Sequence, residues 1–228
     1  MLQISTIHYK HPESKLFENN HQFKAFPAQS DSTIDFNSAQ FFALGLLNVE
    51  TLIDNCTDEI LLGYPPSEWL AESEYVAYKN INGKWQLDEA NNEDWTFEFE
   101  EEQARFDALK SFHAQHGFLQ YHADKAPGDS SKSSLVTLGG QPMLGCNWDA
   151  YIWEDEEQLD TLMDAMDEDD SNEQAQELLK RSIVMNIDGD IYHYVAQISC
   201  MNYVESSADL IYFYNPQKKR VVMGVDFS

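Results

Sequence analysis

The clearest pattern of apolar and polar positions lies near the C-terminus, where it predicts a series of strands. Ile191 to Cys200 and Ala208 to Tyr214 are rich in β-branched and aromatic side chains, and a final strand is expected from Arg220 to Phe227. Turns are predicted at Asp188-Gly189, a pair suited to a tight hairpin, and at Asn215-Pro216-Gln217. This part of the chain therefore predicts an antiparallel meander.

A second hairpin is predicted in the N-terminal half. Tyr75 to Lys79 and Lys84 to Leu87 flank Asn82-Gly83, a pair that suits the positive φ angles of a type I′ turn. From Trp95 to Phe99, aromatic residues alternate with polar ones. Because side chains of a strand point alternately to its two faces, this segment is expected to be a strand with one buried face.

The remaining N-terminal segments have a weaker pattern. The apolar run from Phe41 to Leu47 is expected to be buried, but periodicity alone cannot distinguish a helix from a strand there. Asn48 is expected to cap a short helix through Ile53. Residues 1–40 are mixed and polar, so we expect extended segments and loops that lie over a core and contribute no chemistry.

One long helix is predicted from Glu101 to His116. Phe106, Leu109 and Phe112 recur at helical spacing and are expected to face the core. Gly117 follows directly and suits the C-terminal cap, because glycine readily adopts the left-handed conformation that ends many helices.

The small and polar residues from Ala126 to Ser134 are typical of a linker. A linker at this place divides the chain into two parts of comparable size. We therefore expect a single domain, residues 1–228, that can be split into two subdomains at 1–125 and 135–228.

Acidic residues dominate the stretch from Glu154 to Glu177, which contains twelve carboxylates and no Lys or Arg. Apolar residues still recur there at helical spacing, which predicts a helix that docks by one stripe, and Ser171 to Gln174 has capping-box form for a second helix. The predicted fold class is therefore α+β, with antiparallel sheets, a few packed helices and a protruding acidic helical pair. The residues of the stripe are Leu159, Leu162, Met163 and Met166.

Composition and charge limit the classes of partner. The 228 residues have a formal net charge of -26 at pH 7 and are 43% hydrophobic, which excludes global disorder. Such a charge repels nucleic acid and favours a basic protein or cations, with a solvated, solubilising surface as the alternative. No segment approaches the roughly 20 apolar residues that span a bilayer, and no signal peptide is recognised at the start. We therefore expect a cytoplasmic protein without nucleic-acid or membrane partners.

No catalytic, cofactor-binding or metal-binding residues are predicted. Cys56, Cys146 and Cys200 are widely spaced and are expected to be reduced and mostly buried. The chain has no zinc-protease, serine-hydrolase, kinase or P-loop motif, and its seven histidines do not fall at recognisable ligand or triad spacing. An EF-hand loop from Asp167 fails because Asn172 stands where that loop needs glycine. The sequence therefore favours a binding protein over an enzyme.

Three short motifs in the C-terminal half resemble the YwqG-like family. They are Leu138 to Pro142 with its Gly-Gly turn, Val195 to Ile198, and the aromatic strand Leu210 to Tyr214. The resemblance covers residues 135–227 and implies a mixed α+β fold with antiparallel sheets, but it implies no catalytic residues. The acidic stretch separates the first two motifs, and we expect function to reside in such an addition to a shared scaffold.

The sequence leads to the hypothesis of a bacterial immunity or antitoxin-type protein that neutralises a basic toxin, with a nuclease as the favoured target. Carboxylates would steer the encounter and nearby aromatic side chains would anchor the complex, although core packing is the alternative role of those aromatics. The alternative function is a cation- or small-ligand-binding module. The residues predicted to bind the partner are Glu154, Asp155, Glu156, Glu157, Asp160, Asp164, Asp167, Glu168, Asp169, Asp170, Trp148, Tyr151 and Trp153.

Overall fold

Antiparallel strands make up most of the structure, which is a computed structural model that describes residues 1–28, 41–64, 75–87, 100–121, 125–150, 152–167, 173–204 and 207–227. The predicted class of antiparallel sheets with a few helices is confirmed, with more strand than helix. The strands are β1 (Leu2–Tyr9), β2 (Ser14–Leu16), β3 (Phe23–Ala25), β4 (Phe42–Asn48), β5 (Glu59–Tyr64), β6 (Val76–Ile81), β7 (Lys84–Leu87), β8 (Leu119–Gln120), β9 (Lys132–Ser133), β10 (Val136–Leu138), β11 (Arg181–Ile187), β12 (Asp190–Ser199), β13 (Asp209–Asn215) and β14 (Arg220–Asp226). The helices are α1 (Glu100–His116), α2 (Glu156–Asp167) and α3 (Glu173–Leu179).

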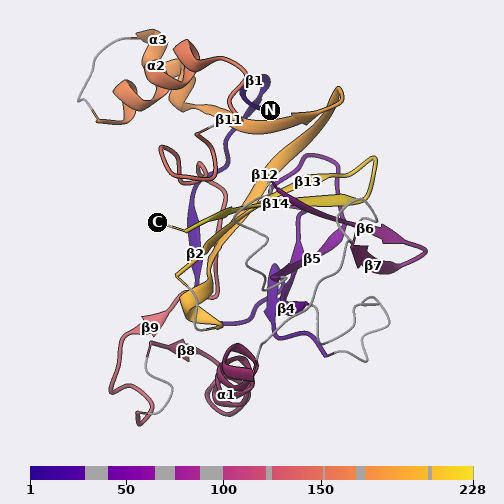
Figure 1. The fold of residues 1–228 in the computed structure, drawn as a ribbon, viewed down its shortest axis with the longest axis vertical. Helices are drawn as coiled ribbons and strands as arrows, with labels where there is room; N and C mark the ends of the chain where they lie inside the picture. Colours follow the sequence, from indigo (N-terminus) through magenta and orange to yellow (C-terminus); the bar gives the residue numbers. More distant parts are fainter. Residues whose placement is uncertain are drawn as a thin grey trace.

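The main sheet runs in the order β1-β11-β12-β13-β14-β6-β7, with antiparallel pairing throughout (Figure 1). The predicted C-terminal meander is therefore confirmed. Strand β12 is long enough to pair with two neighbours on one edge: β11 pairs with its first half and β10, which carries β2, pairs with its second half. The ladder between β12 and β13 is irregular between Tyr194 and Ala196, near the change of neighbour.

Both predicted tight hairpins are present. Asn82 and Gly83 have φ angles of 54° and 85°, and Asp188 and Gly189 have φ angles of 54° and 86°. Both central residues of each turn are thus left-handed, which is the type I′ geometry that matches the twist of the flanking strands. These local signals fix β6-β7 and β11-β12 without help from the rest of the chain.

A small sheet of β3, β4 and β5 packs against one face of the main sheet, and the buried side of α1 adds to the same core. The run whose type the sequence left open is therefore a strand, β4. The short helix expected from Asn48 to Ile53 is wrong: Leu52 N and Ile53 N both donate to Val49 O in a single turn. Because Asn48 pairs with Glu59, the chain between them must reverse direction and has no room to extend a helix.

The other face of the main sheet is covered by Trp148, Ile152 and Trp153 and by α2. Leu162 is fully buried there, but Met166 is 48% exposed, so the predicted stripe is wrong at its last position. Ala165 is buried instead. The buried arc of α2 is centred between Leu162 and Ala165, and at 100° per residue Met166 falls at its side.

Helix α1 follows the prediction closely. Phe106, Leu109 and Phe112 are buried, and Gly117 has a φ of 77° with its N–H donating to His113 O at 2.8 Å. Figure 1 shows α1 at one end of the molecule and α2 with α3 at the opposite end, with the main sheet between them.

The segment predicted as a linker contains β9, which pairs with β8, and Gly128 N donates to the side chain of Gln120 at 3.1 Å. The largest core cluster takes side chains from before this segment, such as Leu119, and from after it, such as Leu210. The strand predicted from Trp95 to Phe99 lies outside the described residues. Within the described ranges, no helix has the length and apolar character needed to cross a membrane.

Candidate functional site

The predicted partner-binding carboxylates occupy the outer surface of α2 and the two residues before it. Six of them are described with their side chains, and all six are exposed: Glu154, Asp155, Glu156, Glu157, Asp160 and Asp164. Asp155 also caps α2, because its Oδ1 accepts the N–H of Gln158 at 3.1 Å. Asp167 ends α2, with no side-chain placement to describe, and Tyr151 and Glu168 to Asp170 lie outside the described residues.

Some acidic side chains of this protein form ion pairs, and these six carboxylates form none with a described residue. Glu177 of α3 forms ion pairs with Lys180 at 3.2 Å and Arg181 at 3.3 Å, and Asp58 pairs with Lys219. Among the side chains that the structure places, none of the six carboxylates on and before α2 forms an ion pair. Among the described residues, no cationic side chain compensates their charge.

The two described tryptophans of the predicted interface are buried beneath this surface. Trp148 and Trp153 are each 6% exposed and belong to the core on this face of the sheet. The Trp148 Nε1–H donates to Met143 O at 2.9 Å, and a Cβ added at Gly224 would lie 2.6 Å from the Trp148 ring. The placement of these two rings fits core packing, which is their alternative role. The surface here carries the carboxylates and neither of the two rings.

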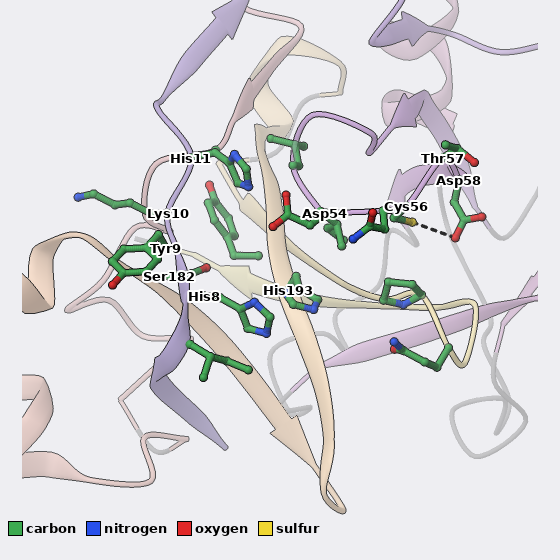
Figure 2. A pocket seen from close by; sticks show the side chains of 18 of the residues that line it. His8, Tyr9, Lys10, His11, Asp54, Cys56, Thr57, Asp58, Ser182 and His193 are labelled. Atoms are coloured by element: carbon green, nitrogen blue, oxygen red, sulfur yellow. Dashed lines mark hydrogen bonds between the residues drawn. The ribbon is translucent and has the colours of Figure 1, made fainter.

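A cavity of about 800 Å³ lies at the place where β11 gives way to β10 along β12 (Figure 2). Its lining comes from segments that are far apart in sequence, and part of it belongs to the N-terminal region from which no chemistry was expected. The lining segments are residues 7–11, 52–58, 139–140, 182, 193–194 and 216–217 with 219.

A wide bulge in β1 forms one wall of the cavity. Ile4 pairs with Ile183 and Tyr9 pairs with Arg181, so the four residues 5–8 of β1 oppose the single residue Ser182 of β11. The bulge is held by Ser5, whose Oγ accepts the N–H of Ile7 at 3.2 Å and of His8 at 2.8 Å. Bulges of this kind redirect side chains and are frequent beside functional sites.

Left-handed backbone conformations also concentrate around the cavity. Gly139 and Gly140 have φ angles of 62° and 70°, and Asn55 and Lys219, which are not glycines, have φ angles of 59° and 50°. A Cβ at Gly139 would lie 2.6 Å from the carbonyl oxygen of Pro12, so the predicted Gly-Gly turn is required by close packing. Such conformations cost free energy and persist where the surrounding structure demands them.

Three histidines that the sequence analysis did not associate line this cavity. The rings of His8 and His193 meet edge to face with centroids 4.5 Å apart, and Figure 2 shows His11 and Asp54 near them. Burial, and secondarily the neighbouring His8, lower the pKa of His193 to about 4, although Asp54 acts in the opposite direction. His193 is therefore neutral at pH 7.

Asp58 organises the wall of the cavity opposite β1. Its carboxylate accepts hydrogen bonds from Lys219 at 2.6 and 2.7 Å, from Tyr214 at 2.8 Å and from Cys56 at 3.2 Å. Burial acts to raise the pKa of Asp58, but these hydrogen bonds outweigh it and hold the pKa below its ordinary value. The Asp58 oxygens are thus already occupied by protein donors.

The chemistry of the cavity is hydrogen bonding rather than a preformed metal centre. Within the described part of the chain, no three His, Cys, Asp or Glu side chains are grouped so that they could hold one metal ion. The three cysteines are free, with Cys56 and Cys200 buried and Cys146 half-buried, and burial raises the pKa of each thiol.

Sequence reasoning missed the cavity because its histidines are distant from one another in the chain. The β11-β12 hairpin follows from the Asp188-Gly189 turn, but no local motif reports the pairing of β1 with β11, which brings His8 to His193. Two local signals fall on the lining of the cavity: the Gly139-Gly140 turn and the turn at Asn215-Pro216-Gln217.

Neither a family model, nor a curated protein, nor a solved structure matches this chain. The resemblance to the YwqG-like family therefore stays a prediction.

Proposed function

We propose that this protein binds a basic protein through the acidic outer face of α2, as an immunity or antitoxin-type inhibitor of a basic toxin. One observation carries the proposal: the six described carboxylates on and before α2 are exposed and have no ion-pair partner among the described residues. A basic partner would supply counter-charges that the described residues do not.

The carboxylates of α2 are closely spaced, and their mutual repulsion favours a cationic partner. Asp160 and Asp164 lie four residues apart on α2, where like charges destabilise a helix. Cationic side chains of a partner relieve this repulsion and are drawn to the surface at long range, which can raise association rates by about 10- to 1000-fold. The same field weakens as salt is added, because the Debye length is about 8 Å at physiological ionic strength.

The contacts that hold α2 in place favour a preorganised acidic surface. Leu162 and Ala165 are buried on its inner side, and Gln158 accepts the backbone N–H of Ile4 in β1 at 3.0 Å. A helix held in this way presents its carboxylates without first paying an ordering cost. We further propose that α2 and α3 form the protruding acidic pair that the sequence predicts.

The favoured partner is a nuclease toxin, because enzymes that act on nucleic acid present cationic grooves where an acidic helix can take the place of phosphates. Three free cysteines without a disulfide fit a reducing compartment, so we place the complex in the cytoplasm.

The test is a low-salt affinity capture from the native host, followed by kinetics with the purified partner. We compare the wild-type protein with the triple variant Glu157→Lys, Asp160→Lys and Asp164→Lys. A basic partner is expected to be captured by the wild type, and the triple variant is expected to slow its association at least about tenfold at low salt.

A charge-matched control separates the site from the overall charge. Glu50, Asp107 and Asp129 are exposed and lie outside α2, and their replacement by Lys changes the net charge by the same amount. The proposal is overturned if both triple variants slow association equally, or if neither does. A gain in thermal stability with Ca²⁺ or Mg²⁺ beyond that in sodium at matched ionic strength would instead favour the alternative of a cation-binding module.

A further inference from the structure

The histidine-lined cavity contains imidazole N–H groups that are not committed to other groups of the described protein. The side chains of His8, His11 and His193 make no hydrogen bond with any described residue, whereas both oxygens of Asp58 and the ammonium of Lys219 are committed to each other and to Tyr214. The other carboxylate of the lining, Asp54, is exposed.

A buried hydroxyl at the same place lacks a partner. Tyr194 lines the cavity and is 6% exposed, and its Oη has no hydrogen-bond partner among the described residues. Leaving such a group unsatisfied is unfavourable, so a bound molecule or a water is needed to complete it. The orphaned hydroxyl is a second observation, independent of the histidines, that points to an occupant.

We propose that this cavity binds a small solute through a carboxylate or phosphate group, with His8, His11 and His193 as hydrogen-bond donors to its oxygens. The shared chemistry is that of an oxyanion. This site is separate from the acidic face of α2 and gives the protein a ligand in addition to a basic partner.

The ligand groups of the cavity suit an oxyanion better than a metal ion. The Lys219 ammonium neutralises the Asp58 carboxylate in the same lining, and the described residues offer no group of three metal ligands. An oxyanion that accepts a hydrogen bond from His193 also stabilises a proton on that ring, which offsets the effect of burial. The net charge of -26 repels an anion at long range, so affinity must come from contacts inside the cavity.

The conformational irregularities support a built site. The bulge that aims His8 at His193, the left-handed Asn55 and the tightly packed Gly139 all border one cavity, although each belongs to a different segment. Strained positions that gather from separate segments around one cavity are typical of binding sites.

The probes are inorganic phosphate and, in a separate titration, succinate, which distinguish phosphoryl ligands from carboxylates. NMR of the imidazole groups is expected to show saturable shifts of His8, His11 and His193 with at least one probe, and none for His21, which is exposed and outside the cavity. Calorimetry is expected to show at least tenfold weaker binding for His8→Asn and His193→Asn, with His21→Asn unchanged.

Saturable shifts confined to the cavity histidines support the proposal even where a variant fails to fold. Absence of saturable binding by both probes, or binding that His8→Asn and His193→Asn leave unchanged in folded protein, overturns it. The α2 triple variant is expected to keep the oxyanion site, and His8→Asn is expected to keep the basic partner, so the two proposals fail independently.

Discussion

The outer face of α2 and the histidine cavity differ in how they are built. The α2 face belongs to a regular helix, and its carboxylates lie close together in the chain. They are exposed and form no ion pair with a described residue. The cavity combines separate segments through a bulge, a Gly-Gly turn and two left-handed non-glycine residues. Charge density can thus be encoded locally, whereas converging side chains require irregular backbone fixed by tertiary contacts.

The largest expected effect is on the free energy of unfolding and concerns Trp148, which is buried beneath the α2 face. Replacing Trp148 by Ala removes a 6% exposed ring and its hydrogen bond to Met143 O, and should lower the free energy of unfolding by about 3–5 kcal/mol. Urea unfolding measures this loss of stability. Ile81→Ala is the control, because the Ile81 side chain is 37% exposed. A loss no larger than that of the control would mean that Trp148 is not part of the core.

The next effect tests whether the wall of the cavity is held by its hydrogen bonds. Asp58→Asn should cost about 1.5–3 kcal/mol, because three donors lose a charged acceptor. Asp190→Asn is the control: its pair with Lys218 is exposed on both sides and should contribute about 0–1 kcal/mol.

The lowered pKa of Asp58 also sets a pH dependence. The carboxylate stabilises the folded state fully above the ordinary pKa of 3.8, and this contribution is lost as the pH falls through the lower folded-state value. Unfolding curves of wild type and Asp58→Asn should therefore converge toward pH 2. Parallel curves down to that pH would contradict the assignment.

His193 affects stability in a different pH window. Its folded-state pKa is about 4 and its ordinary pKa is 6.5, so between these values the unfolded chain binds a proton that the folded protein excludes. Stability should therefore fall from pH 6.5 to pH 4, and His193→Asn should lose less over this range than wild type or His21→Asn. Equal losses in urea unfolding would show that His193 is not held neutral by the fold.

The smallest effect belongs to the α2 face. Asp164→Lys converts a repulsive pair with Asp160 into an attractive one and should raise the free energy of unfolding by about 0.4–1 kcal/mol at low salt. The gain should disappear at high salt, and Asp164→Asn should give about half of it. A loss of stability at low salt would indicate that Asp164 has a counter-charge in the folded protein.

The sequence by itself determined the elements whose signals are local. The two Asn-Gly and Asp-Gly hairpins, the C-terminal meander, α1 with its Gly117 cap and the acidic α2 follow from turn chemistry and periodicity, because neighbours within a few residues decide them. The two wrong predictions have tertiary causes: the expected helix after Asn48 depended on where the chain goes next, and the inward Met166 on which arc of α2 meets the sheet.

Only the tertiary structure decided what the side chains can bind. It placed Trp148 and Trp153 in the core rather than on the surface, and it joined His8 to His193 through two successive strand pairings. Pairing register depends on contacts between residues far apart in the chain, so no local pattern reports it. The net charge can therefore be read from the sequence. The cavity exists only because the folded chain brings its separate lining segments together.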